Sequence, residues 1–458
     1  MFYKLNKLQI VLFGLTLLLV ACNSNTTKQY PSEGEPVLFA EHIAPIIRKN
    51  CSKCHNEEGG APFNLYNFEQ VASKGKLIQY VTENRIMPPW PADPNYTHFA
   101  NETYLTDEEI ALIGRWVKEG NQPGYTASLT DYIPPTKNIN GTFSKLIKIP
   151  TPFEIKGDNQ DRFYVVKFPI ELGSDTFLKA VEFVPHQKKL VHHMNAHLIN
   201  YEENAKSDLH KGNYFIRQDQ SESMRIHQDL NLTNDDGTYP AMTPSVCNYL
   251  PGSQFSFYPH GIGGYRIHKK AALYLNDIHF GPSAKDELDS SYFRLYFDTN
   301  APTRPVSEFQ LGTLGLSPVE PKLVIEPNTI KTFHIQFTVP LDISIVSIVP
   351  HMHLIGKKFL AYAIKPSGDT IRLIHIPSWD FRWQYFYMPK KMLPIPRGST
   401  IYVEGIYDNT ENNPNNPFSP PRLISEKNGS MKTTDEMFQL ILSYVKYQKG
   451  DEEIELEE

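Results

Sequence analysis

Two histidines separated by a single residue, His351 and His353, have the side-chain type and the spacing of a metal site. Side chains on a strand alternate between its faces, so residues two apart point the same way, whereas on a helix they diverge by roughly 200°. The flanking segments 343–349 and 359–364 are rich in residues that favour strands. Two imidazoles on one strand face are two candidate metal ligands, and the alternative is a chance pair of surface or core histidines.

A second motif, Cys51-x-x-Cys54-His55, has the spacing of c-type haem attachment. Two thioethers would fix the haem edge on one turn, while His55 reaches the iron as its proximal ligand. A zinc site would need a second cysteine pair, and a thioredoxin-like site would need a βαβ context; the sequence offers neither. Met87 is the predicted sixth ligand, with a core methionine as the alternative interpretation and His98 as the fallback ligand.

The amino-terminal segment has the features of a bacterial lipoprotein signal. Lysines precede an apolar run at 8–20 that is too short to span a bilayer comfortably. The run ends in Ala21-Cys22, which resembles a lipobox and implies cleavage before Cys22 and lipidation of its sulfur. A plain membrane anchor or an ordinary signal peptide is the alternative. We therefore expect a lipid-anchored protein of the cell envelope that faces the periplasm or the cell surface.

Length and composition predict a multi-domain chain. With 458 residues it is too long for one ordinary core, and 36 prolines with 12% aromatic residues suit β-rich domains with many turns. A net charge of -6 gives no indication of a nucleic-acid partner, and Cys247 is left unpaired, so we expect no structural disulfide. The expected parts are a signal peptide (1–21), a flexible tether (22–36), an all-α haem domain (37–125), a linker (126–148), two all-β sandwiches (149–295 and 296–450) and an acidic, disordered tail (451–458).

The elements that must position these residues follow from periodicity. Helices are expected at 39–49 and, after a capping box that begins at Thr106, as far as Glu119. Strands are expected at 163–169 and 176–184. The segments 180–186 and 346–351 share an aliphatic strand that ends in Pro-His, which indicates an internal repeat and two related β-sandwich halves.

The first half carries the adjacent pair His192 and His193, and later His279 at the exit of a strand-like segment. Neighbouring strand residues face opposite sides, so both histidines can bind one ion only if the strand has a bulge or a local twist. In the second half Met437 precedes an apolar strand, and its thioether favours Cu(I). Other histidines are interpreted as turn or core residues: His186, His197, His260 and His334. Of these, His186 and His197 lie near enough in the sequence to be candidates for supporting the ligands.

Taken in order, these motifs resemble the copper type II, ascorbate-dependent monooxygenases, the class of the peptidylglycine α-hydroxylating and dopamine β-monooxygenases. The resemblance covers 149–450 and rests on the segments 191–194, 350–357 and 435–437 together with His279. It implies two jelly-roll-like β-sandwiches and two copper ions. It further implies an electron-transfer copper on His192, His193 and His279. The copper that binds O₂ and abstracts hydrogen would be held by His351, His353 and Met437, and the two ions would face a solvent cleft.

Three positions depart from the family's pattern. Peptide-hydroxylating members carry an Arg two residues before the His-x-His pair, where this chain has Val349, so the clamp for a peptide carboxylate is missing. They also carry a Tyr four residues after the Met, where this chain has Ile441. Asp277 stands where the family often has Gln. A glycine-extended peptide is therefore not the expected substrate.

The sequence thus predicts a copper monooxygenase that hydroxylates a C–H bond of a small organic substrate with O₂. The segment 37–125 resembles a class I-like cytochrome c, whose haem c would pass on electrons from an external donor one at a time. The alternative is a non-enzymatic lipoprotein that binds haem and copper for electron transfer or copper carriage. A third possibility is a scaffold for partner binding, which would hold no copper.

Overall fold

The computed structural model describes residues 30–57, 59–125, 143–218, 225–251, 262–298, 300–427 and 432–456. The predicted signal peptide, the lipidation site Cys22, His260 and most of the predicted linker lie outside the described residues. Within the described ranges, no helix is both long and apolar enough to cross a membrane.

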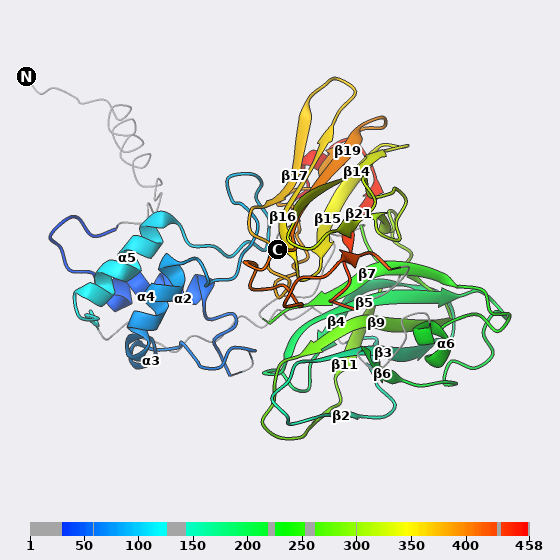
Figure 1. Ribbon diagram of the computed structural model, residues 1–458, viewed down its shortest axis with the longest axis horizontal. Coiled ribbons are helices and arrows are strands. Elements are labelled where there is room, and N and C mark those ends of the chain that lie inside the picture. The colour runs from blue at the N-terminus through cyan, green and yellow to red at the C-terminus, as the bar shows by residue number, and fades with distance from the viewer. Residues whose placement is uncertain are drawn as a thin grey trace, which may run out of the picture.

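The chain is mostly β-sheet with few helices, as predicted, and Figure 1 shows most of these helices beside two stacked β-layered units. The helical elements are η1 (Phe39–Ile43), α2 (Ala44–Asn50), α3 (Phe68–Ser73), α4 (Gly75–Glu83), α5 (Asp107–Lys118), α6 (Ile226–Asp229) and η5 (Asp451–Glu453).

Helix α5 begins and ends at the predicted signals. Thr106 and Glu109 form the capping box: the Thr106 hydroxyl accepts from the Glu109 N–H at 3.2 Å, and the Glu109 carboxylate accepts from the Thr106 N–H at 3.1 Å. Gly120, with φ +87°, follows the helix. The buried face presents Ile113 and Trp116 to a hydrophobic cluster shared with η1, α2, α3 and α4. The amphipathic pattern therefore gives the helix and also its packing face.

The first sandwich packs two antiparallel sheets against each other. One sheet has the order β1 (Lys145–Lys148), β11 (Tyr292–Phe297), β4 (Thr176–Val184), β8 (Arg266–Ile267). The other has the order β6 (Phe215–Arg217), β3 (Arg162–Glu171), β9 (Lys270–Phe280), β5 (Val191–Tyr201), β7 (Ala241–Tyr249). A small pair is formed by β2 (Phe153–Ile155) and β10 (Glu287–Asp289). The end of the predicted linker is thus a strand, because β1 pairs with β11.

The second sandwich is built in the same way. One sheet has the order β12 (Ser307–Gly312), β21 (Phe438–Lys446), β15 (Ile343–Met352), β18 (Leu393–Ile395). The other has the order β14 (Ile330–Thr338), β19 (Thr400–Asp408), β16 (Gly356–Ile364), β17 (Thr370–Ile376). A small pair is formed by β13 (Val324–Ile325) and β20 (Ile424–Ser425).

The strand order confirms the predicted internal repeat. The sheet β1-β11-β4-β8 corresponds in chain order to β12-β21-β15-β18, and β3-β9-β5-β7 corresponds to β14-β19-β16-β17. The two segments that share the Pro-His pattern end β4 and lie in β15, which hold equivalent places in their sheets. Two copies of one eight-stranded topology therefore follow each other in the chain.

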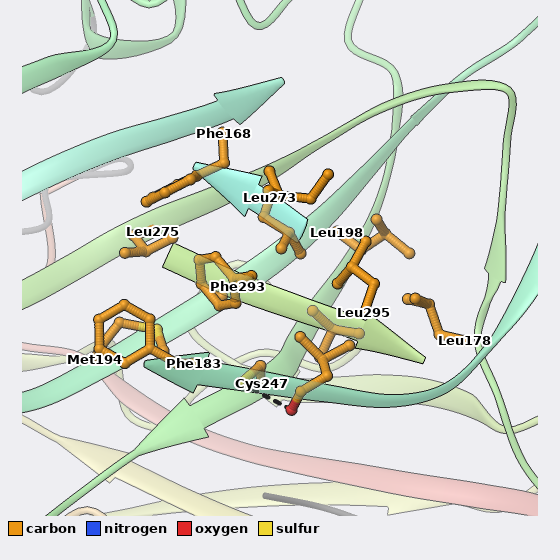
Figure 2. Close-up of a cluster of buried hydrophobic side chains, with 14 of the residues drawn as sticks. Phe168, Leu178, Phe183, Met194, Leu198, Cys247, Leu273, Leu275, Phe293 and Leu295 are labelled. Carbon is orange, nitrogen blue, oxygen red and sulfur yellow. Dashed lines mark hydrogen bonds between the residues drawn. The ribbon is translucent and has the colours of Figure 1, made fainter. Parts of the chain in front are cut away.

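The core of the first sandwich comes from the inward-facing residues of both sheets (Figure 2). Phe168, Leu273 and Phe293 are almost completely buried there, and each such side chain contributes about 1.5–3 kcal/mol on leaving water. Cys247 lies in the same core, where its thiol donates to the Val181 carbonyl oxygen at 3.6 Å. The cluster also includes residues of the second sandwich: Val346, Met392, Val445 and Leu456. The two sandwiches are therefore joined by apolar packing.

The acidic tail is packed, contrary to the prediction of disorder. Asp451 in η5 pairs with Arg304 through two contacts of 2.6 and 2.7 Å, and it accepts from the Ser344 hydroxyl at 2.5 Å. Leu456 is buried. The sequence alone did not indicate this packing, because Arg304, the cation that pairs with Asp451, lies 147 residues earlier in the chain.

Replacing Asp451 by Asn is expected to lower the free energy of unfolding by about 3–5 kcal/mol, because the buried Arg304 guanidinium loses its counter-charge. The pairing lowers the pKa of Asp451, so its contribution is present above the carboxyl's unfolded pKa and is lost as the pH falls through the lowered value. Urea unfolding at pH 7 and at pH 3 measures both effects. Glu452→Gln, an exposed neighbour, is the control, and equal stability of the two variants at pH 7 would contradict the assignment.

Candidate functional site

A β-bulge brings the three histidines of the first sandwich together. Val191 of β5 lies opposite Phe280 of β9, and His193 lies opposite His279, so His192 is an extra residue in the pairing. The ring of His279 lies 4.7 Å from that of His192 and 5.0 Å from that of His193, between centroids. The strand thus has the bulge that two adjacent histidines need if they are to approach one point.

Two carboxylates fix how these imidazoles are protonated. Asp277 accepts from His193 Nε2 at 3.0 Å, and Asp161 accepts from His279 Nε2 at 2.7 Å. A proton on Nε2 leaves the lone pair on Nδ1. Both Nδ1 atoms are buried and have no hydrogen-bond partner among the described residues. Burial lowers the pKa of His279 to about 4, so its ring is neutral at pH 7, as a metal ligand must be.

Asp161 was missed in the sequence analysis. The ligand atoms of Asp161, His192 and His279 all lie within 4.8 Å of one another, which is close enough for a shared metal ion. Asp161 comes from the turn before β3 and has a half-exposed side chain. The only signal in the sequence was a polar turn with two aspartates directly before a strand. Because Asp161 accepts from His279 Nε2, it lies beside the imidazoles as an orienting partner, and the imidazole donors suit copper and other late first-row metals.

Gly281 provides the space for His192. A Cβ added at Gly281 would lie 2.4 Å from His192 Nε2, far inside van der Waals contact. The glycine directly follows β9, two residues after His279, so the strand end and the bulge are fitted to each other. The imidazole of His192 is therefore seated in a position that only a glycine leaves open.

The second set of predicted ligands also comes together. In the pairing of β15 with β21, His351 lies opposite Gln439, and the last residue of β15, Met352, lies opposite the first residue of β21, Phe438. His353 directly follows β15 and Met437 directly precedes β21, so these two residues lie at neighbouring strand ends. The ring centroids of His351 and His353 are 5.0 Å apart and the rings are perpendicular. The strand ends at Met352, so His353 belongs to the following turn.

The second set is also held in one protonation state. Nδ1 of His351 lies 2.5 Å from the Gln384 amide oxygen, and Nδ1 of His353 lies 2.9 Å from the Asp435 carbonyl oxygen. Both contacts require a proton on Nδ1 and leave the Nε2 lone pairs on the opposite side of each ring. Burial lowers the pKa of His351 to about 3, so the ring is neutral.

A buried carboxylate fixes the turn that carries His353 and Met437. Glu436 accepts three backbone N–H groups, from His353 at 2.9 Å, Ile355 at 3.0 Å and Met437 at 3.2 Å. Burial raises the pKa of Glu436 to about 8, although the three donors act in the opposite direction. The sequence motif contained Glu436, but only the structure shows that Glu436 holds the backbone of two candidate ligands, His353 and Met437.

The two ligand sets face a common region between the sandwiches. The Phe381 ring lies 5.6 Å from the His193 ring and 5.7 Å from the His353 ring, edge to face in both cases. Residues of both halves, among them His193, Asp277, His351 and Met437, line one cavity of about 950 Å³. Each set therefore contributes at least one candidate ligand to the lining of one space, His193 from the first set and His351 and Met437 from the second.

The predicted haem-attachment turn follows α2. His55 Nδ1 donates to the Phe63 carbonyl oxygen at 3.0 Å, which leaves Nε2 as the nitrogen that would reach an iron. The Cys54 thiol donates to the Pro251 carbonyl oxygen of the first sandwich at 3.2 Å. The residues present are compatible with a haem ligated by His55.

The sixth haem ligand stays a prediction. Met87 is half-buried at the start of the loop from α4 to α5, and His98 in the same loop is exposed and pairs with Glu102. No hydrogen bond or ring contact joins either residue to His55 in the described part of the chain. Three residues after Met87, Trp90 packs on Tyr385 and Tyr387 of the second sandwich, with centroid distances of 5.2 and 5.3 Å.

Comparison with known proteins does not identify a family. Neither the protein-family models nor the curated proteins give a match to the chain. Solved structures that match include that of the infectious bursal disease virus Gt strain, at 10% identity over 71% of this chain and 77% of that chain, with a TM-score of 0.17. The STIV MCP matches at 11% identity over 58% and 95%, with a TM-score of 0.17, and PNGF-II at 9% over 66% and 59%, with a TM-score of 0.19. TM-scores this low carry no information on fold or function.

If the first ligand set binds copper, as the sequence predicts, replacing Gly281 by Ala is expected to displace His192 and to remove that one ion from the protein reconstituted with copper. The added methyl group would occupy the position of the His192 ring. Elemental analysis after removal of loosely bound copper measures the change. Gly173→Ala is the matched control, because no atom lies within 4 Å of its added Cβ. Unchanged copper in Gly281→Ala would show that His192 is not a ligand.

Proposed function

We propose that this chain is a copper-dependent monooxygenase that hydroxylates a C–H bond of an organic substrate. The observation that carries the proposal is the pair of donor sets, three imidazoles and two imidazoles with a thioether, which share one cavity through His193, His351 and Met437. Copper bound at these sets would supply one-electron chemistry with O₂. The balanced reaction converts R–H, O₂, two electrons and two protons into R–OH and water.

The protein's own residues prepare both sets for metal binding. Asp277 and Asp161 hold protons on Nε2 in the first set, so Nδ1 is the donor atom there. Gln384 and the Asp435 carbonyl hold protons on Nδ1 in the second set, so Nε2 is the donor atom there. Opposite ring nitrogens thus are free on His193 and His279 of the first set and on His351 and His353 of the second, and each of these four rings is oriented by a partner on its other nitrogen.

The cavity supports a substrate other than a peptide carboxylate. Val349 and Ile441, which stand where peptide-hydroxylating members carry Arg and Tyr, both line it. They lie near His351 on β15 and near Met437 on β21, and they are apolar. An apolar surface beside the second ligand set would hold the hydrocarbon part of a substrate, not a carboxylate.

We further propose that residues 37–125 form a cytochrome c-like domain with haem c on Cys51, Cys54 and His55, and Met87 as sixth ligand. Such a haem would supply single electrons from an external donor. Cys54 contacts Pro251, and it lies near enough to Tyr385 to add to the effect of burial in raising the pKa of that hydroxyl. Tyr385 directly follows Gln384, which contacts His351. This proximity supports delivery of electrons to the copper sets within one chain.

Attachment to the membrane completes the proposal. A lipid on Cys22 would hold the chain at the cell envelope, facing the periplasm or the cell surface.

The chain without its lipid, reconstituted with copper, is expected to contain two copper ions for each haem iron. His351→Ala is expected to retain the iron and to lose one copper ion and the hydroxylating activity, because it removes a ligand of the second set. Elemental analysis and product analysis with ¹⁸O₂ measure both. His334→Ala, an exposed histidine of β14, is the control. Iron without copper, or hydroxylation that survives His351→Ala, would contradict the proposal; the former would leave a haem protein on a binding scaffold.

Rapid mixing tests the electron route. The reduced haem is expected to oxidise at least tenfold faster when copper and O₂ are both present than with O₂ alone, because the ligand sets would provide the acceptor. The absorbance of the reduced haem measures the rate. The same experiment on His351→Ala loaded with copper serves as the control. Equal rates with and without copper would exclude the relay but would leave the copper count unaffected.

A further inference from the structure

The loop between α4 and α5 leaves the helical unit (37–125) and reaches the second sandwich (Figure 1). We call its residues 90–102 the strap. Phe99 of the strap is 1% exposed and belongs to the hydrophobic core of that sandwich. The Asp93 carboxylate lies 3.0 Å from His375 Nδ1 of β17, and the Asp93 N–H donates to the His375 carbonyl oxygen at 2.8 Å. The strap therefore packs as part of the second sandwich, although it belongs in sequence to the helical unit.

The strap adds an outer edge to the sheet that contains β15. Between the two lies an extended stretch, residues 384–389, which we call the middle segment. Tyr387 exchanges backbone hydrogen bonds of 2.8 and 3.0 Å with Ile348 of β15. The next residue, Met388, accepts from the N–H of Ala100 in the strap at 2.7 Å. Successive residues of the middle segment thus bond to opposite neighbours, as in a strand that lies between two others.

The middle segment orients a ligand of the second set. Gln384 is its first residue, and the Gln384 amide oxygen lies 2.5 Å from His351 Nδ1. The Gln384 amide nitrogen donates to the Phe381 carbonyl oxygen at 3.0 Å, so its own loop fixes which way the amide points. Ile348, which pairs with Tyr387, lies three residues before His351 on β15. The position of the middle segment therefore sets both the strand that carries His351 and the group that keeps a proton on its Nδ1.

Trp90 is the strap residue that packs on the side chains of the middle segment. Its ring centroid lies 5.2 Å from that of Tyr385 and 5.3 Å from that of Tyr387, and both tyrosines are buried. Tyr385 directly follows Gln384. Loss of the Trp90 ring would leave a void beside both tyrosines, which the chain fills only by moving. A displacement of about 1 Å would bring the contact between Gln384 and His351 to the limit of a hydrogen bond.

We propose that the strap positions the second ligand set: Trp90 and Asn101 hold the middle segment against β15, and through it Gln384 orients the imidazole of His351. Trp90 is then a positioning residue, because it acts on His351 through Tyr385 and Gln384. The first set is oriented by carboxylates of the first sandwich, so the strap serves the second set selectively. That the second set binds copper rests on the proposed function. That the strap holds Gln384 rests on these contacts alone.

Hydrogen exchange of the copper-free chain, measured by mass spectrometry, tests the mechanical part. Trp90→Ala is expected to speed exchange at least tenfold in peptides that cover the middle segment, and to leave peptides of β5 and α5 unchanged. Asn101→Ala is expected to act in the same direction. It removes an exposed side chain that donates to the Phe386 carbonyl oxygen at 2.9 Å, so no core is emptied.

Two further variants make this result specific. Trp90→Phe keeps a ring on the tyrosines and is expected to exchange like the unmodified chain. Tyr80→Ala, an aromatic residue of α4 that is 59% exposed, is the matched control. Unchanged exchange of the middle segment in both Trp90→Ala and Asn101→Ala overturns the proposal. Equal acceleration along the whole chain also overturns it, because that would be a general loss of stability.

Copper competition against a chelator tests the selectivity. A His193→Ala background reports the second set alone, and a His351→Ala background reports the first set alone. Adding Trp90→Ala is expected to weaken copper binding about tenfold in the first background and to leave it unchanged in the second, since loss of an orienting partner commonly costs that much affinity. Trp90→Phe is expected to restore it. Equal weakening of both sets, or none of the second, overturns the proposal. No copper in either parent rejects the proposed function, and hydrogen exchange then decides on the strap.

Discussion

The extra residue in the pairing of β5 with β9 is the constraint on which the first ligand set depends. Without the bulge at His192, adjacent histidines would point to opposite faces of the sheet, one into the core and one outward. With it, both rings approach His279, and Gly281 leaves open the space that His192 fills. The pairing of β5 with β9 fixes the position of the bulge, which lies between the pairs Val191–Phe280 and His193–His279, and a second register shift follows between Asn195 and Ala196.

The two ligand sets are not copies of one site, although the two sandwiches are copies of one topology. The first set lies on β5 and β9, whose counterparts in the second sandwich are β16 and β19. The second set lies on β15 and at the start of β21, whose counterparts are β4 and β11. Each sandwich thus presents a different sheet to the shared cavity. The apolar contact that continues from the first core to Val346 and Val445 keeps these two walls together.

Partners far away in the chain decide the protonation of every oriented imidazole. Asp161 lies 118 residues before His279, and the carbonyl of Asp435 lies 82 residues after His353. In these two cases the partner occupies one ring nitrogen and burial lowers the pKa of the imidazole, so the other nitrogen keeps a lone pair that a metal could use.

The sequence by itself determined the elements and most of the ligand candidates. Local periodicity placed the strands around His351, the capping box gave the start of α5, and the Pro-His pattern indicated the repeat, because each of these depends on residues close together in the chain. Only the tertiary structure decided which side chains meet. It brought Asp161 to His279 and buried Asp451 against Arg304, because each of these pairs joins residues more than a hundred positions apart in the chain. It also placed His197 in the lining of the cavity, because that cavity is formed by residues of both sandwiches. Side-chain type and spacing carry no information about such long-range contacts, so they gave the candidate ligands but not the partners that orient them.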